Sequence, residues 1–376
     1  MKIFKKNTLV FTLMLAIFSA LIYQGCVEKV DSEFDFQSDI IFVDAFILTE
    51  LGTSSVTISK STLVNEATFK VVNEVNASVI IENINTGAIV EFIEDSFGIY
   101  NCPSDFVASV GEEWKLHIEL EDGRIIESKT QTVTSPVSID NIQAEYSPEI
   151  EFNAEFGRLV PGHRLSIDWQ DPIGEENFYL WKYKTFEPLF VCKTCDQGVL
   201  RNGECEPSGF NFGPPYFSYP CLPDCWEKRY GQELLVFHDQ LENGAMITDR
   251  EIAILPYLRN PNILVEVQQF SIDRSAYEYF KVINNQVSQS GGLNAPPPAA
   301  LLGNLFNPND ASDLILGQFT AAGITTKRIF IDRSPIIESA LTQMDAIILE
   351  TCVSCPTSYP CIESSTRTPM KPDGWP

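Results

Sequence analysis

The sequence predicts a mainly β protein in which an N-terminal immunoglobulin-like β-sandwich is followed by a larger β-rich domain with one or more helices and a cysteine-rich insertion. Short apolar runs separated by turn residues begin at Asp39, and several of them alternate apolar and polar residues, which is the pattern of a half-buried strand. Five of the ten cysteines fall between residues 186 and 226. The chain has 376 residues, of which 44% are hydrophobic, and a chain of this length usually divides into two domains.

Residues 1–25 have the pattern of a secretion signal peptide. Three lysines precede an uncharged apolar run at residues 9–22, which is too short to span a membrane, and Gly25 and Cys26 follow it. The segment that ends in Cys26 resembles the lipobox of bacterial lipoproteins, and this resemblance implies cleavage before Cys26 and acylation of its sulfur. More than one acyl chain would anchor the protein stably to a membrane. The alternative is an ordinary signal peptide whose removal leaves a soluble product.

The charge of the chain is strongly negative. The formal net charge is -25 at pH 7, and such a surface repels phosphate backbones and anionic headgroups, so we expect neither nucleic-acid binding nor electrostatic attachment to a membrane. Residues 26–38 form an acidic tether, which resembles the signals that send lipoproteins of the Bacteroidota to the outer face of the outer membrane; a solvated linker would have the same composition. The expected location is therefore the outer membrane, with the protein lipid-anchored and facing the cell exterior.

Residues 39–134 are predicted to form the immunoglobulin-like sandwich. Trp114, Leu116 and Ile118 alternate with polar residues, which places one face of that strand in a core. Asp122 and Gly123 stand between two alternating runs, and this pair is a strong hairpin signal. About seven strands fit a sandwich of this length. They are expected at, among others, residues 40–48, 56–59, 77–84, 88–94, 114–120 and 124–130.

Residues 137–351 are predicted to form the second β-rich domain. Ser275 and Glu278 have the spacing of a capping box, and a helix is expected to follow them because apolar residues recur at helical spacing up to a Gly-Gly pair. Those apolar residues are Ala276, Phe280, Ile283 and Val287. The strands are expected at residues 165–169, 177–181, 234–237, 263–270, 314–320 and 328–331. Residues 335–349 fit a helix and a strand equally well.

Nine cysteines follow Cys26. Export would place them in an oxidising compartment, so we expect disulfides. Because nine is odd, one thiol must stay free or pair with another chain, and the isolated Cys102 is the expected one. A zinc ribbon built from the pairs at 192/195 and 221/225 is the alternative, against which the compartment and the intervening Cys205 both argue. The candidate disulfide cysteines are Cys192, Cys195, Cys205, Cys221, Cys225, Cys352, Cys355 and Cys361.

Residues 186–230 form the cysteine- and aromatic-rich insertion. The segment has no apolar periodicity, so we predict a long loop without regular structure that disulfides hold in place. Its aromatic residues either bind a ligand or partner through exposed rings or form a small core of their own, and the sequence leaves both alternatives open. A cysteine-containing tail follows at residues 352–376. The candidate binding aromatics are Phe210, Phe212, Tyr216, Phe217 and Tyr219.

No catalytic residue, metal ligand or cofactor is predicted. The chain has three histidines: His117 alternates with core residues and should face solvent, His163 follows Pro161 and Gly162 in a predicted turn, and His238 lies at a strand end. The sequence has no nucleophile elbow, metalloprotease helix or glycine-rich phosphate loop. Paired carboxylates of a glycoside hydrolase cannot be recognised from spacing alone.

Several local motifs occur in a fixed order along the chain. They are Ile41-Phe42-Val43-Asp44-Ala45, residues 171–179, residues 275–280, Gly303-Asn304, residues 316–319, Cys352-Val353-Ser354-Cys355 and residues 371–375. Their order resembles the Bacteroidota lipoproteins grouped as domain of unknown function 4249, and the match covers nearly the whole mature chain. The chain departs from that family in its long cysteine-rich insertion and in the glycine before Trp375, where the family tends to have an aromatic residue.

The resemblance implies an outer-membrane lipoprotein whose gene accompanies a TonB-dependent transporter, and it carries over no catalytic residue. We therefore expect a lipid-anchored, non-enzymatic binding or accessory protein of unknown ligand, which partners a TonB-dependent transporter in nutrient uptake. A structural or adhesive surface protein is the first alternative. An unrecognised carbohydrate-active enzyme is the second.

Overall fold

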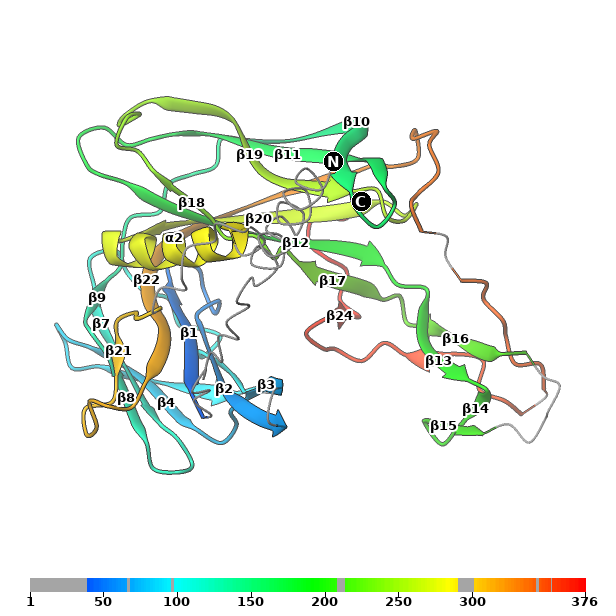
Figure 1. The fold of residues 1–376 in the computed structure, drawn as a ribbon, viewed down its shortest axis with the longest axis horizontal. Coiled ribbons are helices and arrows are strands. Elements are labelled where there is room, and N and C mark those ends of the chain that lie inside the picture. Colours follow the sequence, from blue (N-terminus) through cyan, green and yellow to red (C-terminus); the bar gives the residue numbers. More distant parts are fainter. Residues whose placement is uncertain are drawn as a thin grey trace, which may run out of the picture. The chain divides into compact units, whose positions relative to one another are not determined.

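The computed structural model describes residues 39–65, 68–95, 98–207, 214–289, 301–342, 345–352 and 354–376. Within these ranges the chain consists of strands and a single helix and contains disulfide bonds, which confirms the predicted mainly β fold (Figure 1). The predicted signal peptide, Cys26 and the acidic tether lie outside the described residues, and so do Phe210 and Phe212.

The amino-terminal strands surround the first hydrophobic core in a sandwich-like arrangement. The predicted hairpins are present, since β4 pairs with β5 and β7 pairs with β8. Trp114, Leu116 and Ile118 of β7 are buried, as their alternation predicts. These strands are β1 (Ile41–Leu48), β2 (Ser55–Asn65), β3 (Thr68–Asn73), β4 (Ser78–Asn83), β5 (Ile89–Glu94), β6 (Ile99–Asn101), β7 (Glu113–Glu119), β8 (Ile125–Ser128) and β9 (Gln131–Thr132).

One long strand, β22 (Ile315–Ile331), connects this sandwich to the rest of the molecule. Its first half pairs in parallel with β1 and its second half pairs with β20 (Ile263–Ile272). The short strand β21 (Leu305–Phe306) pairs with β8. Both β21 and the start of β22 therefore contribute side chains to the first core. The two predicted domains thus share strands, and the domain boundaries at residues 134 and 137 stay a prediction.

The second core lies between a three-stranded sheet and the continuation of the main sheet (Figure 1). The three strands are β10 (Asn141–Asn153), β11 (Arg158–Gln170) and β19 (Met246–Pro256); β12 (Phe178–Pro188), β18 (Leu235–His238), β20 and β22 face them. Trp169 and Trp181 are both buried and their ring centroids lie 5.2 Å apart. This aromatic pair anchors the two layers to each other.

The helix α2 (Arg274–Gln289) packs on a third cluster of buried side chains. Ala276 and Phe280 are buried there, and Ile283 packs beside them, as predicted, whereas the side chain of Val287 lies outside the described residues. The predicted capping box of Ser275 and Glu278 is wrong, because the helix starts one residue before Ser275. The helix begins after Asp273, whose carboxylate accepts the backbone N–H of Ala276 at 2.7 Å, and an aspartate is a strong N-cap because it satisfies an otherwise unpaired N–H.

Residues 189–225, here called the arm, project from the end of β12 and return into β17 (Trp226–Tyr230) (Figure 1). The prediction of a loop without regular structure is wrong, because the arm contains β13 (Val191–Asp196), β14 (Gly198–Arg201), β15 (Glu204–Pro207) and β16 (Tyr216–Leu222). Asn202 and Gly203 both have positive φ, which is the requirement of the tight turn that joins β14 to β15.

The end of the chain, residues 345–376, here called the tail, lies against the arm and the main sheet. Its short strands β23 (Tyr359–Pro360) and β24 (Arg367–Thr368) pair with β16 and β17. Trp375 packs edge-on against Phe330, with ring centroids 5.1 Å apart. Residues 335–349, for which the sequence fits a helix and a strand equally well, form neither in their described part. The carbonyl oxygen of Ile348 in this segment accepts the N–H of Ser218 from the arm at 2.6 Å.

Candidate functional site

All eight candidate disulfide cysteines are paired in the structure. Cys192–Cys221 joins β13 to β16, and Cys195–Cys205 joins β13 to β15. Cys225–Cys361 ties the arm to the tail, and Cys352–Cys355 closes a short turn in the tail. Cys102 is the buried free cysteine of the described chain, and burial raises the pKa of its thiol, which keeps it protonated and unreactive.

The zinc ribbon is not supported by this pairing. Its four cysteines belong to three different disulfides, so none of their sulfurs is a thiolate that could bind a metal ion. The Sγ atoms of Cys192, Cys225 and Cys361 lie within 4.8 Å of one another, which reflects two adjacent disulfides.

Of the candidate aromatics that the structure describes, Phe217 and Tyr219 belong to a small core in the arm, whereas Tyr216 lines a cavity beside it and donates its hydroxyl to the carbonyl oxygen of Ala346 at 2.9 Å. Tyr219 is 1% exposed, and it packs with Cys195 and Leu200, while Phe217 covers them. The hydroxyl of Tyr219 accepts the N–H of Leu200 at 2.8 Å and donates to Glu350 of the tail at 2.8 Å. Phe217 and Tyr219 therefore stabilise the arm, and Tyr216 is the described candidate whose ring lines a cavity.

The motif at residues 171–179 closes a turn between β11 and β12. Asp171 is buried, and its carboxylate accepts the hydroxyl of Tyr179 at 2.6 Å and the N–H of Gly244 at 2.8 Å. Burial raises the pKa of Asp171, with the two hydrogen bonds acting in the opposite direction. Asn177 donates to Asp239 at 3.3 Å. This motif holds two loops together and thus has a structural explanation.

His163 is buried in β11, so the predicted turn at residues 161–163 is wrong. Gly162 is required there for close packing rather than for a turn, since a Cβ at this position would lie 2.8 Å from the carbonyl oxygen of Leu255 on β19. The His163 ring lies 5.3 Å from that of Tyr146. Burial and the nearby charge of Arg333 lower its pKa to about 4.

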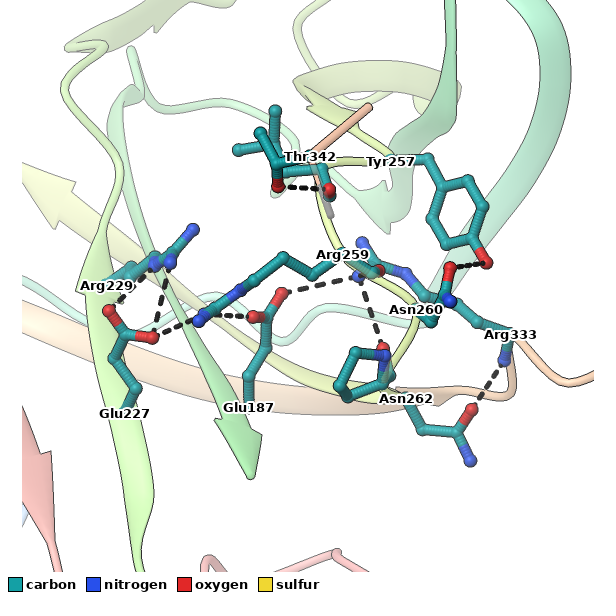
Figure 2. A network of polar contacts seen from close by, with 11 residues as sticks. Glu187, Glu227, Arg229, Tyr257, Arg259, Asn260, Asn262, Arg333 and Thr342 are labelled. Atoms are coloured by element: carbon teal, nitrogen blue, oxygen red, sulfur yellow. Dashed lines mark hydrogen bonds and ion pairs between the residues drawn. The ribbon is translucent and has the colours of Figure 1, made fainter. Parts of the chain in front are cut away.

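The strongest candidate for a functional site is a network of charged residues where the arm joins the body (Figure 2). Glu187 on β12 and Glu227 on β17 are directly opposite each other in the sheet, and like charges in this position repel. The guanidinium of Arg259, from the loop between β19 and β20, lies between the two carboxylates and donates to both. The positive charge of Arg259 therefore offsets the repulsion between the carboxylates of Glu187 and Glu227.

Two further arginines complete the network. Arg229 on β17 pairs with Glu227 at 3.2 Å. Arg333, which follows β22, is 3% exposed and lies 3.3 Å from Glu187, and it also donates to the carbonyl oxygens of Arg259 and Pro261 at 3.2 and 3.3 Å. Three guanidinium groups therefore share two carboxylates, which gives this part of an acidic chain a local excess of positive charge.

The electrostatics of the network differ between its two ends. Burial would raise the pKa of Glu227, but hydrogen bonds from Arg259 and Arg229 outweigh it, and the pKa is lowered. At the other end burial lowers the pKa of Arg333, and the charge of Glu187 only partly opposes this. Arg333 is thus the cation that the network compensates least, although a guanidinium stays protonated at neutral pH.

Cavities open beside the network. The arm cavity, of about 330 Å³, is lined by Phe190 and Tyr216 of the arm, Arg259 and Pro261 of the body, and Ile347 of the tail, among others. A second hollow of about 450 Å³ shares Phe190 and Ile347 with it and continues towards the tail. A third, the Arg333 cavity, is lined by Arg333 and by the loop after it. Chemically, cavities beside these charged residues can bind a charged ligand.

Sequence reasoning missed every residue of this network. Glu187 and Arg333 are 146 positions apart, and no spacing rule connects residues so distant in the chain. The one available local signal was Asn260-Pro261, because a residue before proline is extended and marks a loop between strands.

The comparisons with known proteins give a family and no function. A family model described as Domain of unknown function (DUF4249) matches residues 27–328. No curated protein matches the chain. Among the described residues, no helix has the length and apolar character needed to cross a membrane.

Proposed function

Because the chain belongs to the family Domain of unknown function (DUF4249), as the match over residues 27–328 shows, we propose that it is a lipid-anchored binding protein of the outer membrane. In this proposal Cys26 carries the acyl chains, the protein faces the cell exterior, and it acts without catalysis as an accessory of a TonB-dependent transporter in nutrient uptake. The signal-like residues 1–25 and the junction at Cys26 support the anchor. The net charge of -25 does not favour binding to anionic lipids, so in this proposal the acyl chains alone attach the protein to the membrane.

The observation that carries the binding role is the disulfide-stapled arm with exposed apolar side chains at its base. Phe190 is 47% exposed and Ile347 is 46% exposed, and both line the two adjoining hollows. Three disulfides hold the segments that present them. A partner that docks here would meet a surface that is already ordered, and pre-ordering lowers the entropic cost of binding.

Co-purification tests the proposal. The full-length protein with a carboxyl-terminal tag is expected to bring down a large β-barrel transporter when purified from its native cells in mild detergent. Phe190→Asp is expected to abolish this co-purification, because a charge would be buried in the contact. Ile93→Asp is the matched control, since Ile93 on β5 is 68% exposed and lies outside both hollows, and it should leave the barrel bound.

Two outcomes would contradict the proposal. If no barrel accompanies the wild-type protein in mild detergent, the partnership with a transporter is wrong. If Cys26→Ser stays in the membrane fraction, the lipid anchor is wrong, because removal of the acylated sulfur should release the protein.

A further inference from the structure

The guanidinium of Arg333 lacks a full counter-charge. It reaches Glu187 through one contact of 3.3 Å, and the other oxygen of Glu187 is bound to Arg259. The Nε atom of Arg333 is buried and has no hydrogen-bond partner among the described residues. A buried charge that is incompletely paired destabilises the folded state, so a further anion beside Arg333 would stabilise the molecule.

Arg333 forms part of the wall of a polar cavity. The Arg333 cavity has a volume of about 580 Å³, and Tyr257, Asn260, Ser334 and Thr342 line it as well. The Tyr257 hydroxyl donates to Oδ1 of Asn260 at 3.1 Å (Figure 2), which orients the amide of Asn260. The Nδ2 of that amide has no partner among the described residues and is available to donate to a ligand.

One carboxylate faces the same cavity. Glu338 lines it, but it is exposed and accepts the hydroxyl of Tyr146 at 2.9 Å, which directs it to the neighbouring hollow that Tyr146 and His163 line. Asp332 precedes Arg333 and is also exposed. Both carboxylates are exposed, whereas Arg333 is buried, and charges removed from water interact more strongly than exposed ones.

We propose that the Arg333 cavity binds the oxyanion group of a small polar molecule, either a carboxylate or a phosphate. Arg333 would attract the oxyanion through the charge of its guanidinium, since Nη1 already donates to Glu187 and to the carbonyl oxygens of Arg259 and Pro261. Asn260 and Ser334 would donate to the same oxygens or to hydroxyls of the ligand. The volume accommodates a molecule the size of a monosaccharide acid. This site goes beyond the docking role proposed for the arm and does not rest on it.

Calorimetric titration of the purified full-length protein in mild detergent tests the site. The probes are sodium glucuronate for the carboxylate, sodium phosphate for the phosphate, and glucose at the same ionic strength as the neutral control. Saturable binding of glucuronate alone assigns a carboxylate ligand, and saturable binding of phosphate alone assigns a phosphate ligand. Equal binding of glucose, or no binding of either anion, would overturn the proposal.

Variants then connect the binding to the cavity. Arg333→Met is expected to weaken the affinity at least 100-fold. Since Arg333 is buried and its loss could prevent folding, Asn260→Ala provides a second measurement at an exposed position, with an expected weakening of about fivefold for one hydrogen bond. Arg164→Met is the matched control, because Arg164 pairs with Asp249 and Glu251 outside the network and does not line the cavity. An affinity that Asn260→Ala leaves unchanged, or that Arg164→Met weakens as much, contradicts the assignment.

Discussion

The body and the arm of this molecule are stabilised by different means. In the body, buried strands contribute to three apolar clusters, and β22 reaches all three. In its described residues the arm has two small clusters, one around Cys195, Leu200 and Tyr219 and one around Cys192 and Cys225, and disulfides and contacts with the tail supplement them. A segment of this size buries too little apolar area to fold alone, and covalent links compensate by restricting the unfolded chain.

The charged network lies where these two regions meet. Glu187 and Glu227 belong to the strands that enter and leave the arm, and Arg259 and Arg333 come from loops of the body. The network therefore fixes the base of the arm to the body by polar contacts alone. The comparison implies that a substitution in the body should affect the stability of the whole molecule, whereas a change in the arm should act locally.

The largest effect is expected in the second core. Trp169 has no exposed surface and packs against Trp181 and Phe237, so Trp169→Ala should lower the free energy of unfolding by about 3–5 kcal/mol. Urea denaturation followed by circular dichroism measures this. Trp375→Ala, in the half-exposed tail, is the comparison and should cost less than half as much. If the two substitutions lower the free energy of unfolding equally, the body does not depend on its buried core more than the tail depends on Trp375.

Removal of a disulfide in the arm should have a smaller and local effect. The double substitution of Cys192 and Cys221 by serine opens a link between residues 29 positions apart, which corresponds to about 3.5 kcal/mol of local stability. Limited proteolysis should then cut within the arm, while the urea midpoint of the body stays unchanged. The corresponding double substitution of Cys352 and Cys355, which are 3 positions apart, should cost about 1.5 kcal/mol. A body that unfolds together with the opened arm would refute the division.

A pH-dependent loss is expected in the body from His163. Its folded pKa of about 4 lies below the ordinary value of 6.5, so the unfolded chain binds the proton more tightly and stability falls as the pH drops below 6.5. Linkage gives a loss of about 2 kcal/mol between pH 7.5 and pH 5. His163→Gln should remove this loss in urea titrations at the two pH values. The half-exposed His117, changed to glutamine, is the control; if it has the same effect, burial of His163 is not the cause.

The sequence predicted those parts of the fold that depend on local patterns. The alternation at Trp114, Leu116 and Ile118 and the turn at Asp122-Gly123 appear as expected. The continuity of β22 was not predictable, because small residues at 321–323 interrupt its apolar pattern. Gly323 is needed since a Cβ there would lie 2.3 Å from the nitrogen of Pro136, and such a tertiary contact leaves no sign in the local sequence.

The candidate site was less predictable than the fold. Disulfide formation was predicted from the composition and the expected compartment, but the pairing required the structure, since eight cysteines allow many combinations. The hairpin at Asn202-Gly203 had a recognisable signal. The network around Arg259 and Arg333 had none, because each residue alone is an ordinary charged side chain and only the fold brings them together.

The smallest effect is expected at the start of α2, where no covalent link or large core residue is involved. Asp273 accepts the N–H of Ala276 at 2.7 Å, so Asp273→Ala should cost about 1 kcal/mol, the usual contribution of an N-cap. Ser275→Ala is the matched control: as a position within the first turn it should change stability by only a few tenths of a kcal/mol. The measurement is again the urea midpoint of the body. Since α2 packs on the third core of the body, the loss should appear in the global unfolding transition and leave proteolysis of the arm unaltered. A larger loss of stability for Ser275→Ala than for Asp273→Ala would instead support the capping box that the sequence predicts.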